Sequence, residues 1–178
     1  MSEKKNVYDK AKQQMHLSER ILAAMPGFRG YKEKELRRES DKLIRSHLHQ
    51  RLSEARSDVK GVFQKLSDRR AFEFLTDLDR LVAKMDRVAE KVNHASYGYA
   101  GFFDTFKINE ENLDRMIGFD SELVDDVEKI CEEASAFKSE VAKQDLKKAR
   151  DRIQHLTETI DAFEKTFSQR EEVILGVT

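Results

Sequence analysis

The chain has 178 residues, of which 33 are lysine or arginine and 34 are aspartate or glutamate, so its net charge is -1. This length can bury a hydrophobic core without disulfides or metal, and the single cysteine, Cys131, excludes an intramolecular disulfide and the usual cysteine-pair zinc sites. The near-zero charge provides no overall attraction to nucleic acid, which we therefore do not expect as a partner.

The composition is typical of long amphipathic helices. Charged residues make up 38% and hydrophobic residues 39% of the chain, whereas only seven glycines and one proline, Pro26, are present to interrupt a helix. The N-terminus lacks an apolar signal region, and no stretch approaches the ~18 apolar residues needed to span a bilayer. We predict one soluble, cytoplasmic, all-α domain over residues 1–178.

Two helices are predicted on either side of a turn at residues 26–31. The first covers residues 2–25 and ends at the proline. The two glycines of the turn permit unusual backbone angles, while Phe28 and Tyr31 provide apolar anchors. The second helix is supported by Asp41 and Arg45, placed four residues apart. Its apolar residues recur at helical spacing: Leu36, Leu43, Leu48, Leu52, Ala55, Val59, Val62 and Leu66.

Four polar residues at 67–70 interrupt this apolar stripe. Either Ser67 or Asp68 caps a new helix here, or the four residues mark a stutter in a helix that continues. The sequence permits both. The apolar stripe then resumes, and its face is wider than the seam of a two-stranded coiled coil. Its residues are Leu75, Leu78, Val82, Met85, Ala89 and Val92, flanked by Phe74, Leu81 and Val88.

Residues 94–108 form the most unusual segment of the chain. The segment breaks the helical charge pattern and contains two glycines and five of the chain's aromatic residues. Water-exposed aromatic rings forfeit the free energy of burial, so we expect the segment to be ordered, either closing the bundle or binding a partner. Asn109, followed by Glu110 and Glu111, is a favourable start for the next helix.

Two further apolar stripes complete the chain. One contains Leu113, Met116, Ile117, Leu123, Val127, Ile130, Ala134 and Phe137; the other contains Leu146, Ala149, Ile153, Leu156, Ile160, Phe163, Phe167 and Ile174. Between them, at 138–145, the phase slips without a glycine or a proline. The chain is therefore either an antiparallel bundle of four to five long helices, which base rates favour, or one very long helical hairpin folded at 94–108.

Charges are segregated along the chain. Residues 109–133 carry ten acids against two bases, whereas residues 29–51 carry eight bases against four acids. Charge-matched neighbours avoid the cost of placing like charges together, so we predict that these two segments lie side by side.

No recognisable catalytic or metal-binding motif is present. None of the five histidines has a glutamate three residues before it, as di-iron bundles require, and the His-Glu-x-x-His, phosphate-loop and dinucleotide-binding patterns are absent. Acidic neighbours are expected to raise the pKa of the Cys131 thiol, which argues against a reactive cysteine. We predict that the protein is not an enzyme and binds no cofactor, metal or small-molecule substrate.

Two segments of the sequence resemble segments of other proteins. Residues 26–43 (PGFRGYKEKELRRESDKL) and 97–104 (YGYAGFFD) resemble a group of uncharacterised prokaryotic helical proteins. The likeness extends over most of residues 20–130. It implies a bacterial or archaeal cytoplasmic protein, and it implies no activity, cofactor or site residue.

The sequence thus predicts a non-enzymatic helical scaffold or adaptor that binds a protein partner or self-associates. The residues expected to bind the partner are Tyr97, Tyr99, Phe102, Phe103, Phe106, Phe28 and Tyr31. The alternative is a peripheral membrane or anionic-surface protein that acts through the N-terminal helix and the basic segment 29–51. Its expected contact residues are Arg29, Lys34, Arg37, Arg38, Lys42 and Arg45.

Overall fold

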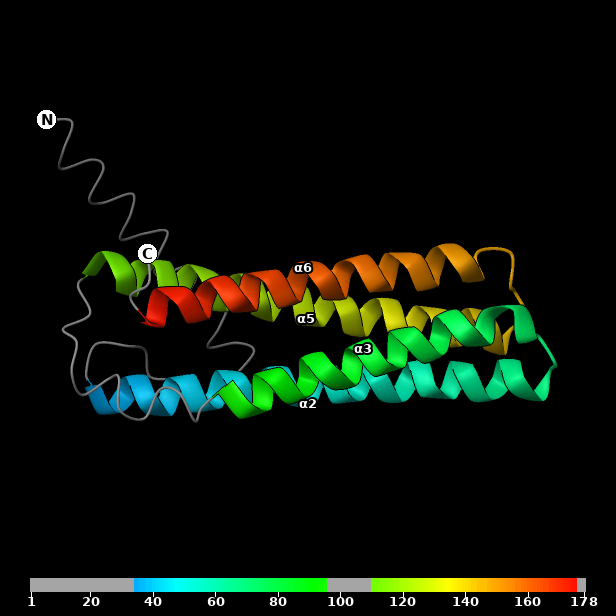
Figure 1. The fold of residues 1–178 in the computed structure, drawn as a ribbon, viewed down its shortest axis with the longest axis horizontal. Helices are drawn as coiled ribbons and strands as arrows, with labels where there is room; N and C mark the ends of the chain where they lie inside the picture. The colour runs from blue at the N-terminus through cyan, green and yellow to red at the C-terminus, as the bar shows by residue number, and fades with distance from the viewer. Residues whose placement is uncertain (1–33, 96–109, 176–178) are drawn as a thin grey trace, which may run out of the picture.

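The computed structural model describes residues 34–95 and 110–175, which form a bundle of long helices (Figure 1). The helices are α2 (Lys34–Asp68), α3 (Leu75–His94), α5 (Glu110–Ala142) and α6 (Ala149–Leu175), and a short 3-10 turn, η1 (Phe72–Phe74), precedes α3. All regular secondary structure within these two ranges is helical, which confirms the all-α prediction. None of these helices is long and apolar enough to cross a membrane.

Each helix packs against two neighbours, so the four stand at the corners of a square. α2 contacts α3 and α5, while α6 contacts α5 and α3. Helices adjacent in sequence are antiparallel, whereas α2 runs parallel to α5 and α3 runs parallel to α6 (Figure 1). Consequently α3 and α5, which residues 96–109 join, stand at opposite corners of the bundle.

The two ends of the bundle differ. At one, here called the hairpin end, lie the short connections from α2 to α3 and from α5 to α6 (Figure 1). At the other, here called the linker end, α2 and α5 begin and α6 ends, whereas α3 ends short of it (Figure 1). Residues 1–33 and 176–178 therefore attach at that end, and residues 96–109 connect the end of α3 to the start of α5. The alternative of one very long hairpin is therefore wrong, because both arms fold back.

Both arms fold back through the same helix-terminating geometry. Arg70 and Gln144 adopt left-handed backbone angles, with φ of 59° and 64°. The N–H of the following residue then bonds back to the helix, from Ala71 to the Leu66 oxygen and from Asp145 to the Glu140 oxygen, both at 3.0 Å. These are the bonds of a Schellman cap, which usually places glycine at the left-handed position.

The helix boundary at 67–70 differs from both predicted forms, because α2 ends at Asp68 instead of continuing. α2 continues through Ser67 to Asp68, and neither residue caps a new helix. α3 is instead preceded by Phe74, whose side chain makes no capping hydrogen bond. The polar run forms the last turn of α2 because the chain reverses at Arg70 rather than at the first polar residue.

Replacing Gln144 with glycine is expected to raise the free energy of unfolding by about 1 kcal/mol. Glycine adopts the left-handed conformation without the steric cost of roughly 1–2 kcal/mol that a side chain imposes. Urea unfolding of the purified protein measures the change. The control is Ser57→Gly on the exposed face of α2, which should destabilise by roughly 0.5–1 kcal/mol; stabilisation by both substitutions would contradict the assignment.

The core follows a repeat in which residue i of the hairpin α2–α3 is matched by residue i+75 of the hairpin α5–α6. Buried positions correspond along the whole length, and the residue volumes often complement each other. The matched pairs include Leu48 and Leu123, Leu52 and Val127, Ala55 and Ile130, Val59 and Ala134, Val62 and Phe137, Leu78 and Ile153, Met85 and Ile160, and Val92 and Phe167. Each hairpin thus buries its apolar face against the other.

One residue of the predicted stripe lies outside the core. Leu43 is 38% exposed, and the neighbouring Ile44 is fully buried in its place. The reason is spacing: Ile44 precedes Leu48 by four residues and Leu52 by eight, which continues the buried face, whereas Leu43 falls beside it.

Candidate functional site

A cluster of buried charged residues lies in the bundle toward the linker end. Arg170 of α6 is fully buried, and its Nε donates a hydrogen bond to Asp120 of α5. Its Nη2 also lies 2.9 Å from Oδ1 of Asp41 on α2, an ion pair without hydrogen-bond geometry. Arg45 completes the cluster, donating from Nε to the other Asp41 oxygen at 2.8 Å. We call these four residues the charge cluster.

The charge cluster joins three helices across the bundle. Arg170 reaches the neighbouring helix α5 and also the diagonally opposite helix α2. Within the charge cluster as defined, two arginines face two aspartates. A buried ion pair often contributes less to stability than an apolar contact of the same size, but loss of one partner leaves an uncompensated charge. The cluster therefore penalises arrangements in which α2, α5 and α6 shift relative to one another.

Sequence reasoning treated Asp41 and Arg45 as a surface pair and did not single out Asp120 or Arg170. A signal for both existed. Arg170 continues the buried spacing of Phe163 and Phe167, and Asp120 precedes the buried Leu123 by three residues. When each of two helices has a charged residue at a core position, and the charges are opposite, the pattern predicts a buried ion pair.

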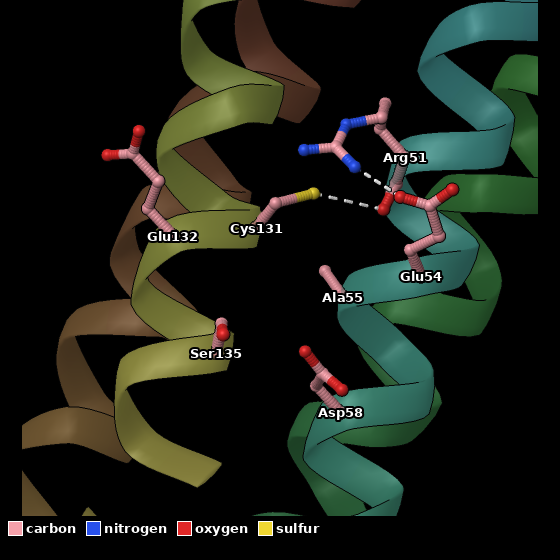
Figure 2. Close-up of a pocket in the computed structure, with 7 residues that line it drawn as sticks. All are labelled: Arg51, Glu54, Ala55, Asp58, Cys131, Glu132 and Ser135. Carbon is pink, nitrogen blue, oxygen red and sulfur yellow. Dashed lines mark hydrogen bonds and ion pairs between the residues drawn. The ribbon is translucent and has the colours of Figure 1, made fainter. Parts of the chain in front are cut away.

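A second feature is an open groove of about 450 Å³ between α2 and α5 (Figure 2). Figure 2 shows the Cys131 thiol pointing across the groove toward the α2 backbone. The thiol donates to the Arg51 carbonyl oxygen at 3.2 Å. The groove is lined by Arg51, Glu54, Ala55 and Asp58 of α2 and by Cys131, Glu132 and Ser135 of α5.

The groove does not contain an activated nucleophile. Burial, more than the neighbouring acids, raises the pKa of the Cys131 thiol to about 11, so the thiol stays protonated at neutral pH. The direction agrees with the sequence-based expectation, although its main cause is burial. The cations at the groove walls are engaged, since Arg51 donates to Glu128 at 2.7 Å and Lys138 to Asp58 at 2.6 Å. The groove is thus better described as a salt-bridged seam between two helices.

The prediction that the basic and acidic segments lie side by side is confirmed within the described residues. Arg51, in the basic segment, pairs with Glu128 in the acidic segment, and α2 packs along α5. His47 lies 3.6 Å from the same carboxylate, but burial lowers its pKa, which favours the neutral imidazole. On the opposite side of the bundle, Lys84 pairs with Asp161 at 2.6 Å.

The residues predicted to contact an anionic surface differ in their exposure to solvent. Lys42 is exposed, whereas Arg45 is buried in the charge cluster and does not belong to a surface set. Lys34, Arg37 and Arg38 lie in the first turns of α2, where only the backbone is described.

The predicted partner-binding residues all fall outside the described part of the chain, as does the predicted helix at 2–25. They are Phe28, Tyr31, Tyr97, Tyr99, Phe102, Phe103 and Phe106, and the anionic-surface candidate Arg29 joins them. The points at which their segments attach are described, however. Lys34 begins α2 and Glu110 begins α5 at the linker end, and Ala95 follows α3, which ends short of that end (Figure 1).

Among the described residues, no group of three or more histidine, cysteine, aspartate or glutamate side chains is arranged to hold a metal ion. Comparisons of the chain with known protein families, with curated proteins and with solved structures found no match.

Proposed function

We propose that the protein is a non-enzymatic helical scaffold that binds a protein partner, or a second copy of itself, at the linker end of the bundle. The observation that carries the proposal is the charge cluster, which ties α2, α5 and α6 together near the end where both aromatic segments attach. A binding surface on a rigid support loses less entropy on association than one on a support that must first be ordered.

The sequence of residues 96–109 is consistent with a contact surface. Its aromatic residues bury large areas with few rotatable bonds, and such residues are enriched at protein interfaces. The segment joins α3 and α5, which stand at opposite corners of the bundle. The proposal assigns Tyr97, Tyr99, Phe102, Phe103 and Phe106 to the partner interface.

The test is the double variant Phe102→Ser/Phe103→Ser. We expect its free energy of unfolding to equal that of the unaltered protein and its association to be lost. Association is measured by sedimentation velocity and, in cells, by crosslinking from a photoreactive analogue that replaces Tyr99. Phe72→Ser, at the exposed hairpin end, is the matched control and should retain association. A loss of several kcal/mol in stability would show that the two phenylalanines close the core, and unchanged association would refute the interface.

A further inference from the structure

Arg69 links the two connections at the hairpin end. Arg69, just after α2, donates from Nη1 to the Val141 oxygen and from Nη2 to the Ala142 oxygen at 3.5 Å, in the last turn of α5. The two connections, residues 69–74 and 143–148, therefore lie at the same end of the long axis and are linked through Arg69 (Figure 1).

The surface at the hairpin end is basic although the chain as a whole is slightly acidic. The two connections carry five basic residues and two acidic ones, all of them exposed. The basic side chains make no ion pair with any described residue. Arg69 donates to backbone carbonyl oxygens of α5, and the charges of the other four are available to a partner. One of the acids, Asp145, accepts a hydrogen bond from the Lys147 backbone N–H at 3.3 Å. The basic residues are Arg69, Arg70, Lys143, Lys147 and Lys148.

An exposed aromatic ring stands within this basic surface. Phe72 is 61% exposed; the other exposed large hydrophobic residue in the described part of the chain is Leu43, which lies toward the opposite end. On either side of Phe72, Ala71 and Phe74 pack against the core and hold the turn in place. The turn therefore presents Phe72 to solvent, close in sequence to the two arginines that follow α2.

We propose that the hairpin end docks on a membrane containing anionic lipids. Phe72 enters the boundary between headgroups and acyl chains, and Arg70, Lys143, Lys147 and Lys148 contact the lipid phosphates and carboxylates. Because the surface lies at the end of the long axis, the bundle stands on the membrane and directs its linker end away from it. The proposal concerns a different surface from the partner-binding end and does not depend on it.

The geometry favours a lipid surface over nucleic acid. Nucleic-acid binding relies on a basic groove or stripe that follows a phosphate backbone, usually with several stacking rings. The hairpin end instead carries one exposed aromatic residue and five basic residues on two short connections, and two acids interrupt any continuous stripe. A tip of this kind fits a planar interface that accepts an apolar side chain at any point.

Insertion is tested with a single fluorescent reporter. The chain contains no tryptophan, so Phe72→Trp creates one reporter at the tip and Leu43→Trp creates a matched reporter toward the linker end. With vesicles of phosphatidylserine and phosphatidylcholine, we expect the emission of the first variant to shift to the blue and to be quenched by brominated acyl chains. The second variant should show neither effect, and phosphatidylcholine vesicles alone should leave both unchanged.

Charge is tested by co-sedimentation with the same vesicles. Arg70→Glu/Lys147→Glu/Lys148→Glu should lower the apparent affinity at least about 100-fold, since each basic residue near an anionic surface contributes a factor of roughly five. Phe72→Ser should lower it about tenfold. The control Lys34→Glu/Arg38→Glu/Lys42→Glu alters the basic segment of α2 and should change affinity less than about twofold, because α2 begins at the far end.

Four outcomes would overturn the proposal. These are no binding of the unaltered protein to anionic vesicles, equal binding to vesicles of phosphatidylcholine alone, loss of binding in the α2 control variant rather than in the tip variant, and a blue shift only in the Leu43→Trp protein. Tighter binding to duplex DNA than to anionic vesicles at the same salt concentration would equally contradict a lipid partner. Circular dichroism of each variant shows that the helices are retained.

Discussion

Replacing Arg170 with alanine is expected to lower the free energy of unfolding by about 3–5 kcal/mol, which is a large part of the stability of a domain this size. The guanidinium is fully buried between Asp41 and Asp120, and its removal leaves two carboxylates without their shared cation in a medium that solvates charge poorly. Equilibrium unfolding in urea, followed by circular dichroism, measures the effect.

Two comparisons separate the loss of the ion pairs from the loss of side-chain volume. Lys165→Ala, on the exposed face of the same helix, should change stability by no more than about 0.5 kcal/mol. Replacing all four members of the charge cluster together with leucine or methionine should recover the stability lost in Arg170→Ala, because no charge is then left unpaired. If the single substitution costs less than about 1 kcal/mol, the cluster does not hold the three helices together.

The second large effect is expected from Phe163→Ala in the centre of the core. Phe163 is fully buried, and its ring stacks on that of Phe167 with centroids 6.4 Å apart and an interplanar angle of 11°. Truncation removes this contact and leaves a cavity between helices that cannot close without moving, so the expected cost is about 3–5 kcal/mol.

The matched control for this substitution is Phe72→Ala, which removes the same side chain from an exposed position. It should alter the free energy of unfolding by less than about 0.5 kcal/mol. Similar costs at the two positions would mean that Phe72 is packed in solution, which would also remove the basis for its insertion into a membrane. The pair therefore tests the core and the hairpin-end surface in one experiment.

Under the two proposals, the two ends of the bundle bind different partners. The hairpin end carries cations and one exposed aromatic ring on short, tightly closed turns. The linker end carries the aromatic segments on a frame held by buried charges. The helices between them supply a rigid spacer, since interhelical ion pairs such as Lys84 with Asp161 and Arg51 with Glu128 lie along its sides.

The sequence by itself determined the helical class and most of the core. Apolar spacing identified buried residues such as Leu48, Val127 and Ile160 correctly, because a long amphipathic pattern is compatible with little else. The segregation of charge likewise predicted that α2 and α5 are neighbours, since opposite charges at a shared boundary lower the energy of that pairing.

Only the tertiary structure decided where the chain folds back and which charges are buried. The two helices end at Arg70 and Gln144, which are not glycine, so the sequence gives no local sign of the left-handed backbone there. This conformation has a small local cost. The cost is offset when α3 and α6 bury their apolar faces, and that gain depends on residues distant in the sequence. The same holds for Asp41 and Arg45. Four residues apart, they suit a solvated helix surface equally well, and their burial depends on Arg170, which reaches them from the far corner of the bundle.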